Sequence, residues 1–370
     1  MLSLLKLSFF ASTLLQPGTD AGDLEVSMSK ESESSQDSPA MDSSYRMSYR
    51  DVAMHKVMLQ DVVRTDAYER AIKKVVRPGL SVLDFGCGTG ILAMLAARAG
   101  AGKVIAVDRS PFIQTALEIA NDNGFDRIEF YHDDHRSLKL NEKVDVIVSE
   151  WMGHCLFYEA MLEPLLAVRD KFLAESGVMI PADVSLHVGL VCDKAVLEDL
   201  SFLRNRPYNI DFSAISAAPF VQSDLVTLDP DSILRNVAHL GSLDMHTIPR
   251  ADGPRVFSGK TTPTRKAEVY ALCGWFSSNL CEGVSFATGP KDIPTHWDQI
   301  LFPLPEPFDV DPARELTITL SPLTEQVGIE QCWSWSIGDQ DRTVSVNERQ
   351  AKWREATDLP KGKLQALRTS

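Results

Sequence analysis

Apolar runs and helical spacing alternate through the first half of this chain. Four short apolar runs read as buried strands, at residues 81–85, 103–108, 127–131 and 144–148. Between them, at 91–99 and 113–121, apolar residues recur every three to four positions, as on one face of a helix. Strands and helices that alternate at this pitch are typical of a parallel sheet wound on both faces. We therefore predict a doubly wound α/β domain over residues 44–181, which begins with a helical segment from about residue 45 to residue 68.

The pattern changes after residue 181. The later apolar runs alternate with polar residues or are rich in β-branched and aromatic residues, for example at 184–191, 267–276, 315–320 and 331–337. Such runs favour antiparallel strands, and we predict a β-barrel domain over residues 182–370. Residues 197–240 show a helical stretch and loops without strand character. We expect them to form an arm that reaches another subunit.

The N-terminal residues 1–43 read as a tail. They are rich in Ser, Asp and Glu, with too few apolar groups to offset the entropy of ordering, so we predict disorder. The first 15 residues imitate a signal peptide, but the apolar run is short for a membrane span and lacks a clear cleavage site. We expect a wrongly assigned start rather than a secretory signal. Six cysteines without metal-type spacing favour free thiols in a reducing compartment, cytoplasmic or nuclear.

Net charge narrows the classes of partner. The chain has 370 residues and a net charge of −14, whereas phosphate neutralisation needs a basic face, so direct nucleic-acid binding is disfavoured. An acidic surface instead suits a positively charged protein substrate. No later segment reads as membrane-spanning.

A glycine-rich turn follows the first predicted strand. Gly86, Gly88 and Gly90 lie where the strand ends and a helix begins, with Asp84 just before them. Asp108, at the end of the next strand, is placed to accept hydrogen bonds from ribose hydroxyls. A dinucleotide oxidoreductase is the rival interpretation, but its fingerprint is G-x-G-x-x-G. The G-x-G-x-G spacing here favours S-adenosylmethionine (SAM) as cofactor.

A third acid is expected after the third strand, toward the adenine of the cofactor. Asp133 or Asp134 suits this place, and Asp134 is preferred. The flanking residues His132 and His135 would also suit a metal site. Nothing else in the sequence supports a metal, and we predict none.

Two glutamates, Glu150 and Glu159, bracket a segment that directly follows the strand at 144–148. A pair of carboxylates at the end of a strand is well placed to hold one planar cation. The guanidinium of arginine, with five donors in a fixed fork, matches such a pair best. The sequence therefore predicts an enzyme that brings a nucleotide-like cofactor to an arginine.

These motifs together resemble those of the protein arginine N-methyltransferases. The matching segments are 84–90, 107–110, 149–159 and 295–297, in that order. The resemblance implies a SAM-binding α/β domain joined to a β-barrel, with a helical arm that makes a head-to-tail homodimer. It is greatest to the asymmetric-dimethylating (type I) class. The implied substrates are Arg-Gly-rich protein segments, such as those of histones or RNA-binding proteins.

The resemblance also implies roles for individual residues. Glu150 and Glu159 would clamp the substrate guanidinium, and His296, paired with Asp61, would take up a proton. Arg64 would bind the methionine carboxylate of the cofactor with His55 beside it, while Gly86, Gly88 and Asp108 hold the nucleoside. The implied substrate-binding residues are Tyr45, Tyr49, Met58 and Trp297.

Several positions depart from the family pattern. His154 stands where tyrosine is usual, Arg46 where phenylalanine is usual, and no glutamate lies near Arg136. These departures leave open an alternative, a catalytically weak or inactive paralogue that acts as a binding or heterodimer partner. Methylation of nucleic acid or of a small molecule lacks a supporting motif.

Overall fold

The computed structural model describes residues 52–157, 161–327 and 330–348. Several sequence predictions fall outside these ranges: the interpretation of residues 1–15, the disordered tail, the departure at Arg46, and the roles of Tyr45, Tyr49 and Glu159. Within them, none of the helices is long and apolar enough to cross a membrane.

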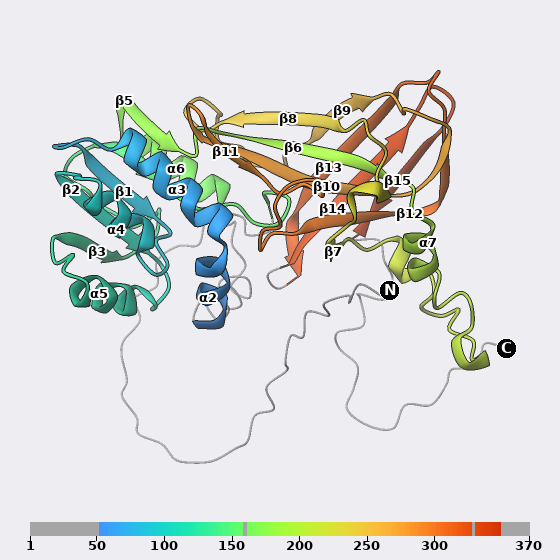
Figure 1. Ribbon diagram of the computed structural model, residues 1–370, viewed down its shortest axis with the longest axis horizontal. Helices are drawn as coiled ribbons and strands as arrows, with labels where there is room; N and C mark the ends of the chain where they lie inside the picture. Colours follow the sequence, from blue (N-terminus) through green and yellow to red (C-terminus); the bar gives the residue numbers. More distant parts are fainter. Residues whose placement is uncertain (1–51, 158–160, 328–329, 349–370) are drawn as a thin grey trace, which may run out of the picture. The chain divides into compact units, whose positions relative to one another are not determined.

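A five-stranded parallel sheet forms the first part of the fold (Figure 1). Its strands are β1 (Ser81–Phe85), β2 (Lys103–Asp108), β3 (Ile128–His132), β4 (Val144–Val148) and β5 (Leu173–Ile180). The helices that connect or precede them are α2 (Val52–Gln60), α3 (Val62–Val75), α4 (Ile91–Arg98), α5 (Ile113–Asp122) and α6 (Leu162–Phe172). The predicted α/β fold is confirmed.

In the strand order β3-β2-β1-β4-β5, β2 and β3 follow on one side of β1, and β4 and β5 follow on its other side. The order of the strands therefore reverses between β1 and β4, although all five are parallel. Such a reversal leaves a crevice outside the carboxyl ends of the two strands, which is where open α/β sheets bind ligands. β1 ends at Phe85 and β4 at Val148, so the glycine turn and Glu150 both open into this crevice. The topology alone therefore brings two segments together that are about 60 residues apart.

The predicted helical segment around residue 60 is divided at Asp61. Its side chain accepts a hydrogen bond from Arg64 N at 2.9 Å, which is the N-cap arrangement for α3. An aspartate that satisfies a free backbone N–H in this way stops one helix and starts another. The spacing of apolar residues continues across the break, which is why the sequence reads as one helix.

The second part of the fold is antiparallel, as predicted. One sheet has the order β7-β12-β10-β6-β8, with β11 paired to β10, and the other has the order β15-β14-β13-β9. The strands of the first sheet are β6 (Asp183–Val191), β7 (Asp224–Val226), β8 (Ala238–Asp244), β10 (Ala267–Cys281), β11 (Val284–Ala287) and β12 (Gln299–Val310). Those of the second are β9 (Phe257–Thr261), β13 (Leu316–Val327), β14 (Glu330–Gly338) and β15 (Thr343–Asn347). The two sheets share a core in which Trp333 and Trp335 pack on Phe302.

The segment predicted as an arm, residues 197–240, contains mostly turns. It includes the end of α7 (Lys194–Leu200), 3₁₀ turns at Pro207–Asn209, Ala218–Phe220 and Pro230–Ser232, and the three-residue strand β7. β7 pairs with β12, although the sequence showed no strand there, because three residues are too few to display an alternation. Several apolar side chains of this segment are exposed, among them Phe202, Tyr208 and Ile210.

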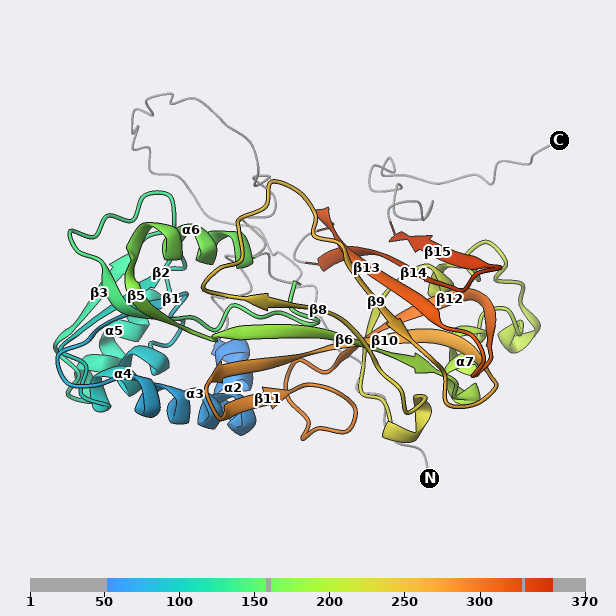
Figure 2. The ribbon, with the colours of Figure 1, turned by 90° about the horizontal axis from the view of Figure 1, so that it is seen from above.

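Hydrogen bonds and packing hold α3 between the two parts. Tyr68 is fully buried and donates from its hydroxyl to Ser149 O at 3.0 Å. Ser149 in turn donates to Phe85 O at 2.7 Å, so α3 is tied to the ends of both β4 and β1. On its other side α3 contacts β10 and β11 (Figure 2). The segment that begins at Asp61 is therefore fixed relative to the crevice.

Asp84, on β1, is the most deeply buried acid of the parallel sheet. Its side chain is 0% exposed, and one oxygen accepts a hydrogen bond from Ala93 N in the first turn of α4, at 2.9 Å. Burial raises the pKa of Asp84 from 3.8 to about 8, and the charge of Asp108 acts in the same direction. The folded protein therefore holds Asp84 protonated at neutral pH.

We expect this carboxyl to make folding stability pH-dependent. Between pH 3.8 and about 8 the unfolded chain ionises Asp84 while the folded chain does not, so stability falls as pH rises. The slope is at most about 1.4 kcal/mol per pH unit. Asp84→Asn cannot ionise, and its amide oxygen still accepts from Ala93. Urea unfolding should show that the stability of the variant relative to wild type increases from pH 5 to pH 8.

Asp145→Asn is the matched control. Hydrogen bonds from the backbone and hydroxyl of Ser81 lower the pKa of Asp145, so its contribution is already present above its ordinary pKa of 3.8. Its replacement should cost the same stability at both pH values. An Asp84→Asn difference that is also constant between pH 5 and pH 8 would show that Asp84 is ionised in the folded protein.

Candidate active site

The glycine turn after β1 forms the floor of the site. Gly86 N and Cys87 N both donate to Val107 O, at 2.8 and 3.0 Å, which closes the turn onto β2. Gly88 has a φ of +51°, and a Cβ there would lie 3.3 Å from Cε1 of His55. A side chain at this position would be strained and would also crowd α2. The turn therefore needs glycine to leave room between α2 and the sheet.

A cavity opens above this turn and is lined by seven of the predicted site residues. Those that line it are His55, Met58, Arg64, Gly86, Gly88, Asp108 and Glu150. A second cavity shares Gly86, Asp108 and Met161 with the first and adds Asp134. Asp108 thus lies where the two cavities meet, with the predicted methionine side in one and the predicted adenine side in the other. Asp84 lines neither cavity, because it lies beneath the turn and supports α4.

Asp108 and Asp134 are held rigidly by backbone amides. Asp108 accepts from Gly88 N at 2.8 Å and from Ser110 N at 2.7 Å, one bond to each oxygen. Since a carboxylate oxygen has two lone pairs, each oxygen retains capacity for a ligand hydroxyl. Burial by itself would raise the pKa of Asp134, but hydrogen bonds from Arg136 N and Ser137 outweigh it and lower the pKa. Asp134 is therefore ionised at neutral pH.

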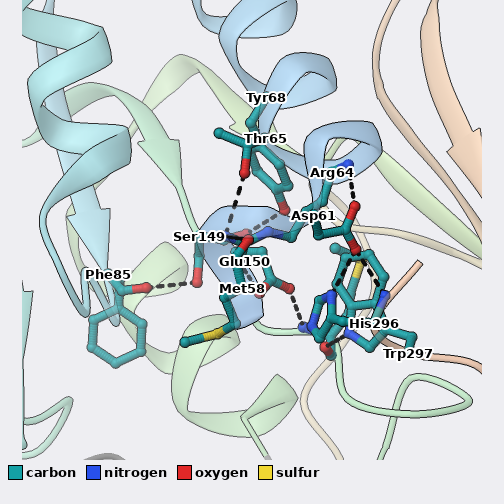
Figure 3. A network of polar contacts seen from close by, with 11 residues as sticks. Met58, Asp61, Arg64, Thr65, Tyr68, Phe85, Ser149, Glu150, His296 and Trp297 are labelled. Atoms are coloured by element: carbon teal, nitrogen blue, oxygen red, sulfur yellow. Dashed lines mark hydrogen bonds and ion pairs between the residues drawn. The ribbon is translucent and has the colours of Figure 1, made fainter. Parts of the chain in front are cut away.

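Arg64 and Glu150 are paired with each other (Figure 3). Nη1 of Arg64 lies 3.0 Å from Oε2 of Glu150, and the two side chains are only 8% and 11% exposed. Nη2 of Arg64 donates to Met58 O at 2.7 Å, and Oε1 of Glu150 accepts from Met152 N at 3.2 Å. The sequence assigned these two residues to different ligands. The structure shows that the carboxylate of Glu150 holds a guanidinium, here one from its own chain.

Asp61 and His296 are in direct contact, although they are 235 positions apart. Oδ2 of Asp61 lies 2.7 Å from Nδ1 of His296 and accepts from His296 N at 2.9 Å. Burial raises the pKa of Asp61, but the hydrogen bonds from His296 and Arg64 N outweigh this and lower it. Nδ1 of His296 therefore faces an ionised hydrogen-bond acceptor.

Trp297 is part of the core. It is 1% exposed and stacks on Phe286, with ring centroids 5.4 Å apart, and its indole N–H donates to Met152 O at 2.6 Å. It thereby connects the segment after β4 to the loop that carries His296. The predicted contact between Trp297 and the substrate stays a prediction.

The sequence assigned no contact to two residues beside the site, Phe112 and His154, although it singled out His154 as a departure from the family pattern. Phe112 lies against His55, with ring centroids 3.8 Å apart, and so covers one side of the turn. Its position directly after the strand that carries Asp108 is a signal that could have found it. His154 hydrogen-bonds to Trp297 O, a contact 143 positions apart that no local pattern announces. Among the described residues no group of three or more His, Cys, Asp or Glu is arranged to hold a metal ion.

Two family models match this chain. Residues 76–210 match a methyltransferase domain, and residues 182–329 match the arginine methyltransferase oligomerization subdomain. The two matches cover both the parallel and the antiparallel parts of the fold.

Individual relatives agree with this. Protein arginine N-methyltransferase 1.1 of Arabidopsis thaliana is 35% identical over 284 residues, which cover 75% of this chain and 73% of the relative. Protein arginine N-methyltransferase 1 of Schizosaccharomyces pombe is 36% identical over 267 residues, which cover 70% of this chain and 78% of the relative. The structure of the Trypanosoma brucei PRMT1 enzyme–prozyme heterotetrameric complex with AdoHcy superimposes with a TM-score of 0.72 and 31% identity, over 81% of this chain and all of that one. This chain belongs to the protein arginine N-methyltransferase family.

Proposed function

We propose that this protein transfers methyl groups from SAM to guanidinium nitrogens of arginine in protein substrates, giving mono- and asymmetric dimethylarginine. The observation that carries the proposal is the pairing of Glu150 with a guanidinium at 3.0 Å, inside the cavity that also contains the glycine turn. The net charge of −14 suits cationic, Arg-Gly-rich segments as substrates.

The residues around the turn fit SAM. A side chain in place of Gly86 or Gly88 would crowd Met161 or His55, so the space over the turn is preserved for a ligand. Asp108 would accept from the ribose hydroxyls, Asp134 would lie toward the adenine, and Arg64 would bind the methionine carboxylate. When bound, SAM supplies a methyl group on a positively charged sulfur. The relative from Trypanosoma brucei was solved with AdoHcy, the demethylated form of this cofactor.

Binding of the cofactor and of the substrate would then be linked through Arg64. Its guanidinium lies on Glu150 at 3.0 Å, and a cofactor carboxylate would compete with Glu150 for the same donors. As Arg64 turns to the cofactor, the carboxylate of Glu150 becomes available to the substrate guanidinium. The exchange keeps each buried charge paired, which avoids the cost of an isolated one.

The chemistry needs positioning more than activation. An arginine guanidinium stays protonated far above neutral pH, so no side chain here deprotonates it in advance. Glu150, with Glu159 as the proposed second carboxylate, would orient the guanidinium and draw its positive charge away from the attacking nitrogen. That nitrogen bonds to the methyl carbon while the carbon–sulfur bond breaks and leaves its electron pair on sulfur. The nitrogen then loses a proton to His296, which the ionised Asp61 stabilises.

A homodimer is also part of the proposal. Tyr208 is 91% exposed and Ile210 is 55% exposed, both in the segment predicted to form the arm. On α2 and α3 the apolar side chains of Val57 and Val62 are exposed as well. A second copy of the chain would bury both sets, and the match to an oligomerization subdomain supports this arrangement.

Replacement of Glu150 tests the carboxylate clamp. Glu150→Gln keeps the shape of the side chain but removes the charge that holds a guanidinium. We expect kcat with an Arg-Gly-rich peptide to fall at least about a hundredfold, the scale of losing one charge-stabilising group. The affinity for SAM, measured by calorimetry, should be at least that of wild type, because Arg64 no longer has to leave Glu150. Glu175→Gln, on the exposed part of β5, is the control and should behave as wild type.

Two outcomes would count against the proposal. Normal turnover by Glu150→Gln would show that the clamp is not used. Absence of methyl transfer by the wild-type chain with labelled SAM and the peptide would favour the alternative of an inactive paralogue that acts as a partner.

Charge placed on the arm tests the homodimer. We expect Ile210→Asp to raise the dimer dissociation constant by at least about tenfold, which corresponds to about 1.4 kcal/mol. Sedimentation of wild type and variant over a range of concentrations measures this directly. Val256→Asp, at another exposed apolar position outside the arm, is the control and should leave the constant unchanged. Equal weakening by both variants, or by neither, would place the interface elsewhere.

A further inference from the structure

The segment after β4 is held in a strained conformation. Gly153 and Leu156 bond to each other through both backbone groups, at 3.2 and 2.9 Å, which makes a tight hairpin with His154 and Cys155 at its tip. Cys155 and Leu156 have φ values of +50° and +74° although neither is glycine. A residue with a side chain adopts such a conformation only where its surroundings enforce it.

Trp297 helps to hold this hairpin in place through two hydrogen bonds. Its indole N–H donates to Met152 O, on one side of the hairpin tip. Its carbonyl oxygen accepts from Nδ1 of His154, at the tip itself. One residue of the His296 loop is therefore bonded to two residues of the hairpin, which restricts both sliding and rotation of the loop against it.

The bond to Trp297 also determines the state of the imidazole. A carbonyl oxygen only accepts, so Nδ1 of His154 must carry the hydrogen. Burial lowers the pKa of His154, and the nearby His296 acts in the same direction, whereas the Trp297 carbonyl and Asp298 oppose it. His154 is therefore neutral at neutral pH. The two imidazoles differ in their surroundings, because only His296 contacts the ionised Asp61.

We propose that His154 is a positioning residue for methyl transfer: its bond to the Trp297 carbonyl fixes the loop that carries His296 relative to Glu150. The path of contacts is short. Glu150 accepts from Met152 N, the hairpin holds Trp297, and Trp297 is the direct neighbour of His296 in the chain. The inference rests on the proposed function, since it assigns His296 and Glu150 to one reaction.

A pair of isosteric variants separates the donor from the shape of the side chain. His154→Asn places an amide N–H close to the position of Nδ1–H, whereas His154→Leu has the same branched shape without a donor. We expect His154→Leu to lower kcat at least about tenfold, since a displacement of about 1 Å at a reacting group can cost about a hundredfold. KM for SAM should change little, because His154 is not among the residues that line the two cavities at the glycine turn. His154→Asn should recover most of the lost kcat.

The outcomes decide the inference in either direction. Equal kcat for the Asn and Leu variants, whether normal or reduced, would show that the bond to Trp297 does not position the loop. If His154→Leu does not fold by thermal melting, His154→Gln replaces it, since its amide lies one methylene further out and does not reproduce the Nδ1 donor.

A measurement that does not depend on enzyme activity tests the contact of His154 independently of the proposed function. The imidazole nitrogen NMR signals of His154, assigned by their loss in His154→Asn, should report a neutral ring with hydrogen on Nδ1 at pH 7. A neutral ring with its hydrogen on Nε2 would overturn the inference even in a fully active enzyme, because Nδ1 could then not donate to the Trp297 carbonyl. If Nδ1 carries the hydrogen but the protein transfers no methyl group, the contact between His154 and Trp297 is supported. Only the proposed function is then contradicted.

Discussion

The buried ion pair between Arg64 and Glu150 is the contact on which the geometry of this site depends. It belongs to a closed ring of contacts: Glu150 accepts from Met152 N, Met152 O accepts from Trp297, and His296 bonds to Asp61, which caps the helix of Arg64. Removing one partner of a buried pair leaves an isolated charge and costs about 3–5 kcal/mol. Replacement of the guanidinium beside Glu150 by another cation is therefore far less costly than its loss.

Asp61 connects two segments of this ring that are far apart in the sequence. One of its oxygens starts α3, and the other holds the loop of His296, so a single carboxylate joins the N-terminal helices to the antiparallel part of the fold. Tyr68, two turns further along α3, ties the same helix to the ends of β1 and β4 through Ser149. His296, the proposed proton acceptor, and Glu150 are therefore built on one rigid frame.

The sequence predicted those parts of the fold that depend on residues close together in the chain. The strands β1 to β4, the helices α4 and α5, the glycine turn and Asp108 all follow from apolar periodicity and from residue types at short spacing. The break at Asp61 was missed because the apolar spacing continues across it, and the pairing of Arg64 with Glu150 because it joins residues 86 positions apart. The bond from His154 to Trp297 is of the same kind. The roles of Glu159, Tyr45 and Tyr49 stay predictions.

In the proposed mechanism, Glu150 holds one guanidinium at a time, and the cofactor decides which one. The most direct measurement is the affinity for an Arg-Gly-rich peptide, by calorimetry, with and without saturating AdoHcy. If AdoHcy draws Arg64 away, the peptide should bind at least about tenfold more tightly in its presence, and AdoHcy should gain the same factor from the peptide. Equal peptide affinity in both conditions would contradict the exchange and would leave Arg64 as a permanent partner of Glu150.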